Sequence, residues 1–368
     1  MKKNTSKKQI ASKGEKQTRT GFAFYIGIDL GDKHSDICVL DPSGEVGKEF
    51  RLRMKEEDFQ TYFASIAHSR VAVEAGGQSR WVAEVIEKCG HEVYVSNTRK
   101  VPYIHQSDDK DDPGDAYKLA ELLYFKPRLL HPIQHRSREA QADLSWIRAR
   151  EVLVESRTQL INAVRGISKA FAGRLEKCSA ESFTAKLAGQ VPEAIRKAVA
   201  PLLETIDHLN EQIRYYDEME EHIARERYPK YWLLEQVNGV GVHTALSFML
   251  TIGDPERFQK SRMVGGFLGM RPKKQESGES KPQLGITKAG DVYLRKTLVN
   301  CAQYILGPFG KDSDLRRFGQ RICERGGKNA KKRAVIAVAR KLAVLLHRLW
   351  ITGEVYEPLR NSKQPIAA

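Results

Sequence analysis

Acidic residues stand at the ends of two apolar segments in the first third of the chain, and more of them gather shortly afterwards. Asp29 lies near the end of the apolar run 25–30, and Glu74 follows the apolar segment 71–73. Five aspartates lie within 108–115. Mg²⁺ prefers oxygen ligands, and two such ions can hold the attacking and leaving oxygens of a phosphodiester. The pattern predicts a metal site made of Asp29, Glu74, Asp112 and Asp115.

Each of these acids also has a structural interpretation. Asp112 before Pro113 is a good helix N-cap, and Asp115 would complete a capping pattern. Glu74 could be a solvated strand end, and Asp29 could serve a turn. The metal-site interpretation therefore depends on one fold that brings the strand ends and the helix start together. Three neighbouring acids could share metal binding: Asp108, Asp109 and Asp111.

The predicted order of elements supplies such a fold. Three short strands are followed by helix, strand, helix, strand and helix. Short connections make the first three strands antiparallel, and helical crossovers make the later strands parallel. This is the order of the ribonuclease-H-like fold, in which Asp29 and Glu74 would end neighbouring strands and the last helix would cross them. The predicted strands are 24–30, 35–40, 46–52, 70–75 and 91–95, and the predicted helices are 56–68, 81–89 and 116–124.

Beyond residue 135 the chain is predicted to be mostly helical, which makes the fold class α/β plus α. Apolar residues recur every three or four positions in 136–227, which predicts a long helical hairpin or a coiled coil. A further unit, 231–350, has Gly-rich loops of its own. Its segment 237–245 has the glycines of a hairpin between helices that exposes backbone N–H groups to phosphate, or of a plain helix turn.

Positive charge is strong and uneven along the chain. There are 61 Lys and Arg against 46 Asp and Glu, a formal charge of +15. Residues 1–20 carry a net +6, residues 257–300 a net +7 and residues 311–350 a net +9. Such segments favour nucleic acid through phosphate contacts and counterion release. The alternative is a merely soluble basic protein, or one bound to anionic lipid. The first 20 residues, nearly all polar, predict a disordered arm.

The sequence gives no sign of a membrane or secreted protein. No segment approaches the roughly 18 consecutive apolar residues of a membrane span. No apolar signal core follows the basic N-terminus before Gly21. The five cysteines are far apart and lack the spacing of a zinc site, which fits a reducing cytoplasm. We therefore expect a cytoplasmic protein without a membrane partner.

Two serines lie in a glycine-containing segment flanked by lysines, 273–281. A serine flanked by cations can attack phosphate, because the cations stabilise the developing oxyanion. Most serines in such loops only form hydrogen bonds. Ser277 and Ser280 are the candidates here.

The ordered set of motifs resembles the transposases of the insertion-sequence-110 family, the DEDD-type enzymes of bacterial mobile elements. The resemblance runs from about residue 24 to residue 350. Its motifs are modest one by one and specific as an ordered set. They lie at 25–31, 73–75, 97–100, 110–116, 237–245, 252–254, 257–258, 269–272, 277–278 and 286–290.

The resemblance implies a RuvC-like domain whose Mg²⁺-binding tetrad falls on Asp29, Glu74, Asp112 and Asp115. It also implies a C-terminal transposase domain whose essential serine falls on Ser277. The expected partners are duplex DNA and a structured guide RNA encoded by the element, in the bacterial cytoplasm and at the nucleoid. Because two duplexes must be cut together, we expect a homodimer that forms a tetramer on DNA. The expected parts are a basic disordered arm (1–21), the RuvC-like domain (22–130), a helical or coiled-coil segment (131–229), the transposase domain (230–356) and a tail (357–368).

Three other functions fit parts of the chain. An actin-like or sugar-kinase ATPase shares the first hairpin, but it needs later glycine-rich nucleotide loops where this chain continues helical and basic. A RuvC-like nuclease or junction resolvase would cut with water and would have no use for the Ser277 loop. A non-catalytic nucleic-acid-binding protein would leave the four acids without a role. A covalent protein–DNA adduct and metal-dependent cleavage distinguish these alternatives.

Overall fold

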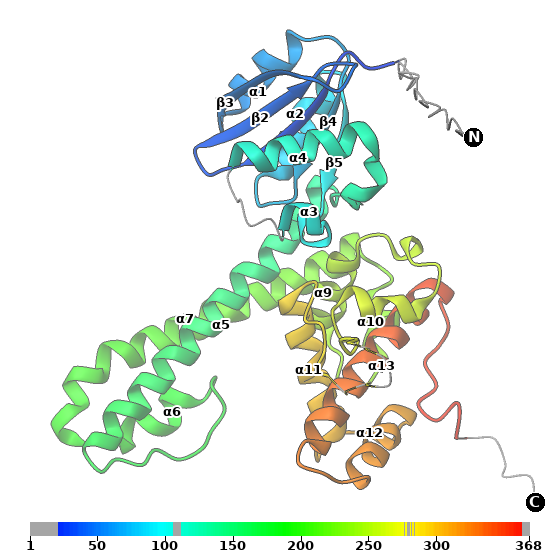
Figure 1. The fold of residues 1–368 in the computed structure, drawn as a ribbon. Helices are drawn as coiled ribbons and strands as arrows, with labels where there is room; N and C mark the ends of the chain where they lie inside the picture. Colours follow the sequence, from blue (N-terminus) through cyan, green and yellow to red (C-terminus); the bar gives the residue numbers. More distant parts are fainter. Residues whose placement is uncertain are drawn as a thin grey trace, which may run out of the picture. The chain divides into compact units, whose positions relative to one another are not determined.

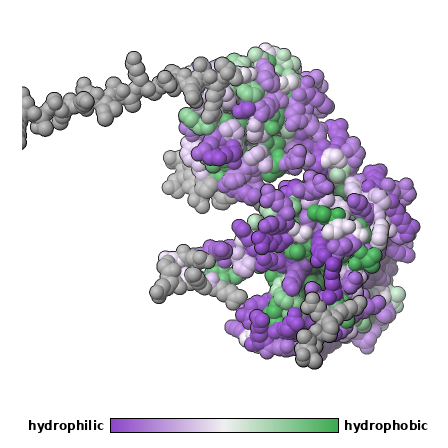
Figure 2. Space-filling model, turned by 90° about the vertical axis from the view of Figure 1, so that its right-hand side faces the viewer, coloured by the Kyte–Doolittle hydropathy of each residue, from purple (hydrophilic) through white to green (hydrophobic). Residues whose placement is uncertain are grey.

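The computed structural model describes residues 21–105, 112–275, 277, 280, 282 and 284–362. The predicted arm, apart from Gly21, lies outside the described residues, and so do Asp108, Asp109 and Asp111. The chain divides into two compact units, Met1–His135 and Arg136–Ala368. The first is a mixed α/β unit and the second is mostly helical, as predicted (Figure 1). On the face drawn in Figure 2, most of the described surface is hydrophilic, which fits apolar side chains gathered in internal cores.

A six-stranded mixed sheet forms the centre of the first unit, in the order β3-β2-β1-β4-β5-β6. β2 is antiparallel to β1 and β3, whereas β4 is parallel to β1 and β5. This confirms the predicted change from hairpin connections to helical crossovers. The short β6, antiparallel to β5, was not predicted. The strands are β1 (Tyr25–Leu30), β2 (His34–Leu40), β3 (Val46–Arg53), β4 (Arg70–Glu74), β5 (Glu92–Ser96) and β6 (Pro132–Ile133).

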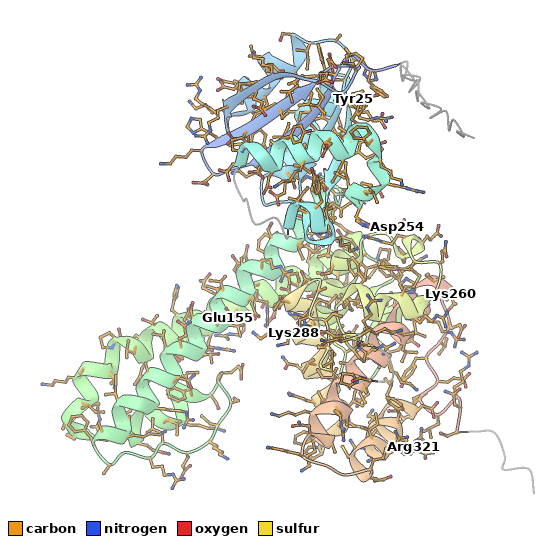
Figure 3. All side chains as sticks on the ribbon, in the orientation of Figure 1. Tyr25, Glu155, Asp254, Lys260, Lys288 and Arg321 are labelled. Atoms are coloured by element: carbon orange, nitrogen blue, oxygen red, sulfur yellow. The ribbon has the colours of Figure 1, made fainter. Side chains whose placement is uncertain are left out.

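Alternate residues of β1 enter two separate cores. Ile26 and Ile28 pack with α1 and α2 on one face of the sheet, and Tyr25 packs with α4 on the other (Figure 3). A Cβ on Gly27 would come within 2.0 Å of the Ala116 carbonyl oxygen, so the missing side chain lets α4 rest directly on β1. The helices of this unit are α1 (Glu56–Ala64), α2 (Ser79–Lys88), α3 (Pro102–His105) and α4 (Asp112–Phe125), with 3₁₀ turns at Thr98–Lys100 and Pro127–Leu130.

Two long helices, α5 (Arg138–Ala170) and α7 (Glu193–Arg227), begin the second unit and pack side by side. Cross-contacts show that they are antiparallel. The pairs are Asp143 with Arg227, Arg150 with Asp217, and Arg157 with Asn210. The short α6 (Phe183–Leu187) and a 3₁₀ turn at Ala188–Gln190 lie between them in the chain. The predicted helical hairpin is thus present, and coiled-coil geometry stays a prediction.

The rest of the second unit packs around α13. Its main core takes buried residues from α9, α11 and α13, including Phe248, Leu298 and Leu342. Gly239, with φ +91°, forms the turn before α9, which confirms a glycine-bearing helix turn within 237–245. The helices are α8 (Tyr231–Glu235), α9 (Val242–Ile252), α10 (Val264–Phe267), α11 (Val292–Leu306), α12 (Asp314–Glu324) and α13 (Ala330–Thr352), with 3₁₀ turns at Pro255–Arg257 and Ser261–Met263.

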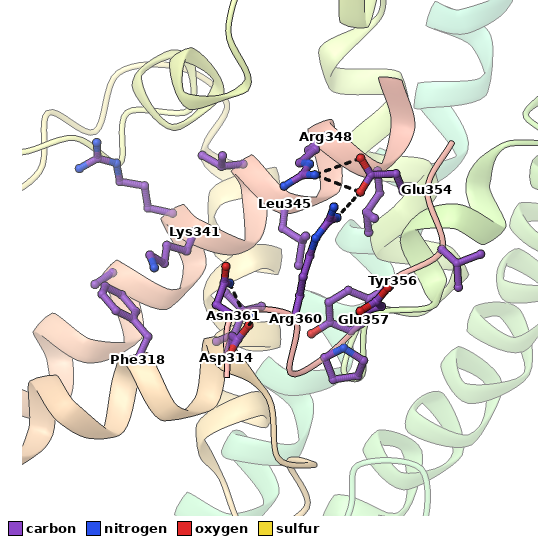
Figure 4. Close-up of a pocket in the computed structure, with 17 residues that line it drawn as sticks. Asp314, Phe318, Lys341, Leu345, Arg348, Glu354, Tyr356, Glu357, Arg360 and Asn361 are labelled. Carbon is purple, nitrogen blue, oxygen red and sulfur yellow. Dashed lines mark hydrogen bonds and ion pairs between the residues drawn. The ribbon is translucent and has the colours of Figure 1, made fainter. Parts of the chain in front are cut away.

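The residues after α13 fold back over α12 and α13 (Figure 4). Glu354 accepts hydrogen bonds from Arg348 at 3.0 Å and from Arg360. Asp314, the first residue of α12, accepts one from the backbone N–H of Asn361 at 2.8 Å. These contacts hold the segment as one wall of a hollow of about 520 Å³.

Two expectations drawn from composition can be compared with the described residues. All five cysteines are free thiols: Cys38, Cys89, Cys178, Cys301 and Cys323. None of the described helices is long and apolar enough to cross a membrane.

Candidate active site

The sheet places Asp29 and Glu74 side by side at one edge. The parallel pairing of β1 with β4 runs up to Ile28 and Val73, and each acid is the next residue of its strand. Gly27, two residues before Asp29, lies directly against α4, and Ala72, two residues before Glu74, belongs to the core under α4. Because side chains two residues apart share a face, both carboxyl groups lie on the α4 side of the sheet. The predicted grouping of the two strand acids is therefore present in the fold.

Burial and neighbouring acids both disfavour the charged form of Asp29. Its pKa is raised to about 8, first by burial, then by a hydrogen bond with Glu74 and by the negative charge of Glu74. Asp112 and Asp115 add smaller contributions in the same direction. The other three predicted acids therefore all act on Asp29. Without a cation, the site holds a proton on Asp29 near neutral pH.

The start of α4 supplies the other two acids. Asp112 is its first residue and is exposed, whereas Asp115, one turn later, is mostly buried. Asp115 accepts a hydrogen bond from Lys118 at 2.9 Å, so part of its charge is already balanced. Glu74 accepts one from the Thr98 hydroxyl at 2.7 Å, which fixes its orientation. The site therefore contains its own hydroxyl and ammonium partners.

The second unit carries Ser277 at the tip of a two-stranded arm between α10 and α11. The arm is held by hydrogen bonds from Lys288 N to Gly269 O, from Thr287 N to Arg271 O, and from Lys273 N to Gly285 O, each 2.9 Å. Its base requires glycine, because a Cβ on Gly269, at φ +68°, would lie 1.9 Å from the Ala289 carbonyl oxygen.

At the tip, Ser277 and Ser280 exchange both backbone hydrogen bonds, at 3.0 and 3.2 Å. Residues paired in this way carry their side chains on the same side of the ribbon. Both serines are exposed. The arm therefore presents both hydroxyl groups together, and its geometry does not favour one over the other.

Comparison with known proteins identifies the family. A family model described as "Transposase", for the DEDD domain of IS110 elements, matches residues 26–170, and the model "Transposase IS116/IS110/IS902 family" matches residues 231–312. Together they cover more than half of the chain. The chain belongs to the IS110 family of transposases. This membership makes it an enzyme of DNA transposition.

Two relatives of this IS110-family chain match most of its length, and a third matches about a third of it. The transposase for insertion sequence element IS1111A of Coxiella burnetii is 27% identical over 341 residues, which cover 90% of each chain. The transposase for insertion sequence element IS1328 of Yersinia enterocolitica is 26% identical, over 76% of this chain and 82% of the relative. The pilin gene-inverting protein of Moraxella lacunata is 30% identical over 114 residues, which are 31% of this chain and 34% of the relative.

The donor set of this transposase suits a divalent cation. DEDD transposase domains generally use divalent metal ions. A bound cation would stabilise the charged form of Asp29, whose pKa is raised by burial and by the other three acids. Within the described residues, however, no three His, Cys, Asp or Glu side chains are close enough to enclose an ion. The acids are joined electrostatically at one sheet edge, but their side chains are not gathered around one point.

The sequence alone did not indicate two further polar residues at this edge of the transposase. Asp36 is buried in β2 and pairs with Arg51 of β3. A charged residue inside the otherwise buried run 35–40 was the available signal, because a buried acid requires a partner. Thr98, the partner of Glu74, lies in the family motif at 97–100, but nothing in its position predicts that contact.

Proposed function

We propose that this transposase cuts and rejoins duplex DNA with Mg²⁺ and a serine nucleophile, guided by a structured RNA that its own element encodes. The observation that carries the proposal is the edge of the sheet where Asp29 and Glu74 end neighbouring strands, and where burial, Glu74, Asp112 and Asp115 all raise the pKa of Asp29. The α/β unit is proposed to be RuvC-like. The proposed functional parts are 22–130 for the metal-dependent domain, 131–229 for the helical segment and 230–356 for the serine domain.

Asp29, Glu74, Asp112 and Asp115 are the proposed Mg²⁺ ligands. When bound there, Mg²⁺ would balance the negative charge that builds up on the phosphate during strand transfer. The side chains around it have separate tasks. Thr98 orients Glu74, and Lys118, one turn further along α4, pairs with Asp115.

Ser277 is the proposed nucleophile. Its Oγ forms a bond to phosphorus while one ester bond between phosphorus and a deoxyribose oxygen breaks. The proton lost from Oγ ends on the leaving oxygen, so one strand end becomes a free hydroxyl and the other a phosphoserine ester. The reverse reaction with a new strand end restores the phosphodiester, and no ATP is needed because the bond energy is kept. Arg271, Lys273 and Lys288 belong to the same arm.

Recombination of two duplexes also suggests an assembly. We propose a homodimer that forms a tetramer on DNA, in the bacterial cytoplasm and at the nucleoid. Large apolar side chains remain exposed on the α5–α7 hairpin, including Val152, Ile167 and Tyr215, which supports a further helical partner. A chain that is monomeric by light scattering and still recombines DNA would contradict this assembly.

The test is denaturing electrophoresis of reactions between the full chain, its RNA and end-labelled DNA of the element. Wild type should give a protein-linked DNA band that survives denaturation. Ser277→Ala should lose it, and Ser280→Ala, the matched variant from the same tip, should keep it. Loss only in Ser280→Ala would move the nucleophile by three residues. Cleavage without any adduct would favour the alternative, a RuvC-like nuclease or junction resolvase that uses water.

Single substitutions test the proposed tetrad. Asp29→Asn, Glu74→Gln, Asp112→Asn and Asp115→Asn should each lower strand cleavage by a factor of 10² or more, on the scale of lost electrostatic stabilisation at phosphoryl groups. Asp58→Asn, an acid of the same unit that pairs with Arg53, is the control and should cleave normally. Full cleavage by one of the four variants would remove that residue from the tetrad.

A further inference from the structure

A row of polar side chains continues beyond β1 and β4, the two strands that supply tetrad acids. Asp29 of β1 is the register partner of Asp36 in β2, and Asp36 is in turn the partner of Arg51 in β3. Directly paired residues place their side chains on the same face of a sheet. The same face therefore carries one continuous row across five strands: Arg51, Asp36, Asp29, Glu74 and Ser96.

Asp36 anchors the end of this row. It is only 8% exposed, and its Oδ1 accepts a hydrogen bond from Arg51 Nε at 2.9 Å. The Arg51 side chain stays 63% exposed. A guanidinium has five N–H donors in one plane, so a bond through Nε to a buried acid fixes that plane while leaving terminal N–H groups towards solvent. Arg51 is thus an oriented cation at the open end of the acidic row.

A hollow of about 230 Å³ lies beside this cation. Its lining includes Arg51, Phe50 and Glu49 of β3, Asp36 of β2, and Pro113 of α4. Pro113 directly follows Asp112, so the hollow joins the guanidinium to the first turn of the helix that supplies two tetrad acids. Bonding to Asp36 and its charge raise the pKa of Arg51, and the charge of Asp112 adds to the rise. Arg51 and the tetrad therefore belong to one electrostatic neighbourhood.

We propose that Arg51 binds a non-bridging phosphate oxygen of the DNA strand next to the phosphate that is cut, and that Asp36 is the positioning residue that holds it. This inference rests on the proposed function of the tetrad. A site of four acids repels a DNA strand, and a fixed cation at its rim would set the strand's register over those acids. Arginine suits this role because its planar donors match phosphate oxygens.

The competing explanation is that Arg51 and Asp36 are merely a cross-strand pair that stabilises the sheet. Arg53 provides a matched control, because it lies two residues further along β3. Its side chain is 62% exposed, and its Nε donates to Asp58 at 2.7 Å. Replacing either arginine by alanine removes one positive charge and one ion pair from the same strand. Only Arg51, however, lies in the row that contains Asp29.

The experiment measures binding of the full chain with its RNA, in EDTA, to a duplex that carries the end of the element. A methylphosphonate replaces one phosphate at a time near the cut site and so removes one charge. For wild type, we expect the affinity to fall on the order of tenfold at one position. Arg51→Ala should bind the unmodified duplex about tenfold more weakly and show no further loss at that position. Arg53→Ala should keep the wild-type pattern.

Further variants separate positioning from folding. Arg51→Lys keeps the charge and should recover part of the affinity. If Arg51→Ala does not fold, Arg51→Gln replaces it in the same measurement. Asp36→Asn should weaken binding severalfold in the wild type and add nothing in the Arg51→Ala background, because it acts through that side chain. Additive losses would overturn the role of Asp36.

Two outcomes overturn the proposal as a whole and show which inference has failed. If wild type cuts the duplex with Mg²⁺ but Arg51→Ala keeps both the wild-type affinity and the full methylphosphonate pattern, only the role of Arg51 is wrong. If wild type neither cuts nor binds this duplex, the proposed function fails, and the role of Arg51 fails with it.

Discussion

The raised pKa of Asp29 shows that its negative charge is unfavourable at the candidate site without a cation. Its pKa is raised to about 8, first by burial and then by Glu74. Between about pH 4 and pH 8, the folded chain therefore keeps a proton that the unfolded chain has lost. Since the unfolded state then binds fewer protons, the free energy of unfolding of the metal-free protein falls as pH rises through this window.

Asp29→Asn should remove this pH dependence. Asparagine keeps the shape of the side chain but cannot ionise, so in EDTA at pH 8 the variant should be more stable than wild type by on the order of 1 kcal/mol, a value discounted for the partial exposure of the site. The difference should shrink towards pH 5. Thermal unfolding at pH 5, 7 and 9 measures it. Identical curves for the two proteins at all three values would contradict the raised pKa.

The control for that measurement is Asp41→Asn. Hydrogen bonds from Ser43 and from the backbone of Glu45 hold the pKa of Asp41 below its usual value. Its substitution removes a carboxylate that the fold favours in the charged form. The variant should therefore gain no stability at any pH, in contrast to Asp29→Asn.

A buried chain of hydrogen bonds in the second unit gives another residue-level prediction. His243 of α9 bonds through Nδ1 to Glu220 of α7 and through Nε2 to the Tyr293 hydroxyl of α11, each at 2.5 Å. Tyr293→Phe leaves a ring nitrogen of His243 without this partner, so it should lower the free energy of unfolding by on the order of 1–3 kcal/mol. Urea denaturation measures the loss. Tyr215→Phe, at a residue 49% exposed, should change it by less than about 0.5 kcal/mol.

At the scale of elements, Gly27 determines whether α4 can position its acids. A Cβ there would lie 2.0 Å from Ala116 O and 2.5 Å from Ala120 N, both backbone atoms of α4. Gly27→Ala should therefore push the helix away from β1, destabilise the first unit by roughly 2–4 kcal/mol and lower DNA cleavage with it. Gly47→Ala, in β3, meets its nearest atom at 3.7 Å and should be tolerated. Thermal melts followed by circular dichroism compare the two variants. A similar small loss of stability in both would mean that Gly27 is not required for the packing of α4 on β1.

Most elements of the first unit follow from local signals in the sequence. The apolar runs and turn residues predicted β1 to β5 within about two residues and placed Asp29 and Glu74 at neighbouring strand ends. The pairing of Asp36 with Arg51 did not follow, because it depends on the register between β2 and β3. The two short elements, α3 and β6, also escaped prediction, since four and two residues are too few to show a period.

The second unit shows the same limit. Periodic apolar residues predicted the helices α5 and α7, because a period of three to four residues is visible along the chain. The paired arm that carries Ser277 was not predicted as an arm. Its hydrogen bonds join residues more than ten positions apart, such as Arg271 and Thr287, and its base depends on the fit of Gly269 against Ala289.

At the scale of the whole molecule, the net charge is +15, and cations cluster around the turn between α12 and α13. Five exposed cations lie on this turn and on the helix ends beside it, and none forms an ion pair with a residue that the structure describes. Arg321 marks this region on α12 (Figure 3). Unpaired cations on one turn favour phosphate contacts that do not depend on base sequence. The five are Arg321, Arg325, Lys328, Lys331 and Lys332.

Nucleic-acid binding by the full chain should therefore depend steeply on salt. If about 6–10 phosphates are neutralised, the affinity should fall roughly 10³–10⁵-fold between 50 and 200 mM salt. Replacing Lys328, Lys331 and Lys332 together by glutamine should reduce the slope of log affinity against log salt by up to about 2.7, since each lost phosphate contact removes about 0.9. Filter binding with duplex DNA and with the RNA measures both slopes.

The matched triple variant replaces Arg196, Arg225 and Arg348, which already pair with Glu193, Glu221 and Glu354. It removes the same net charge, but from cations whose donors are already in use. Its slope should stay close to that of wild type, because a paired arginine releases few counterions when it meets a phosphate. An equal loss of slope in both triple variants would mean that total charge, and not the turn between α12 and α13, determines binding. A wild-type affinity that does not change with salt would exclude a phosphate-based interface altogether.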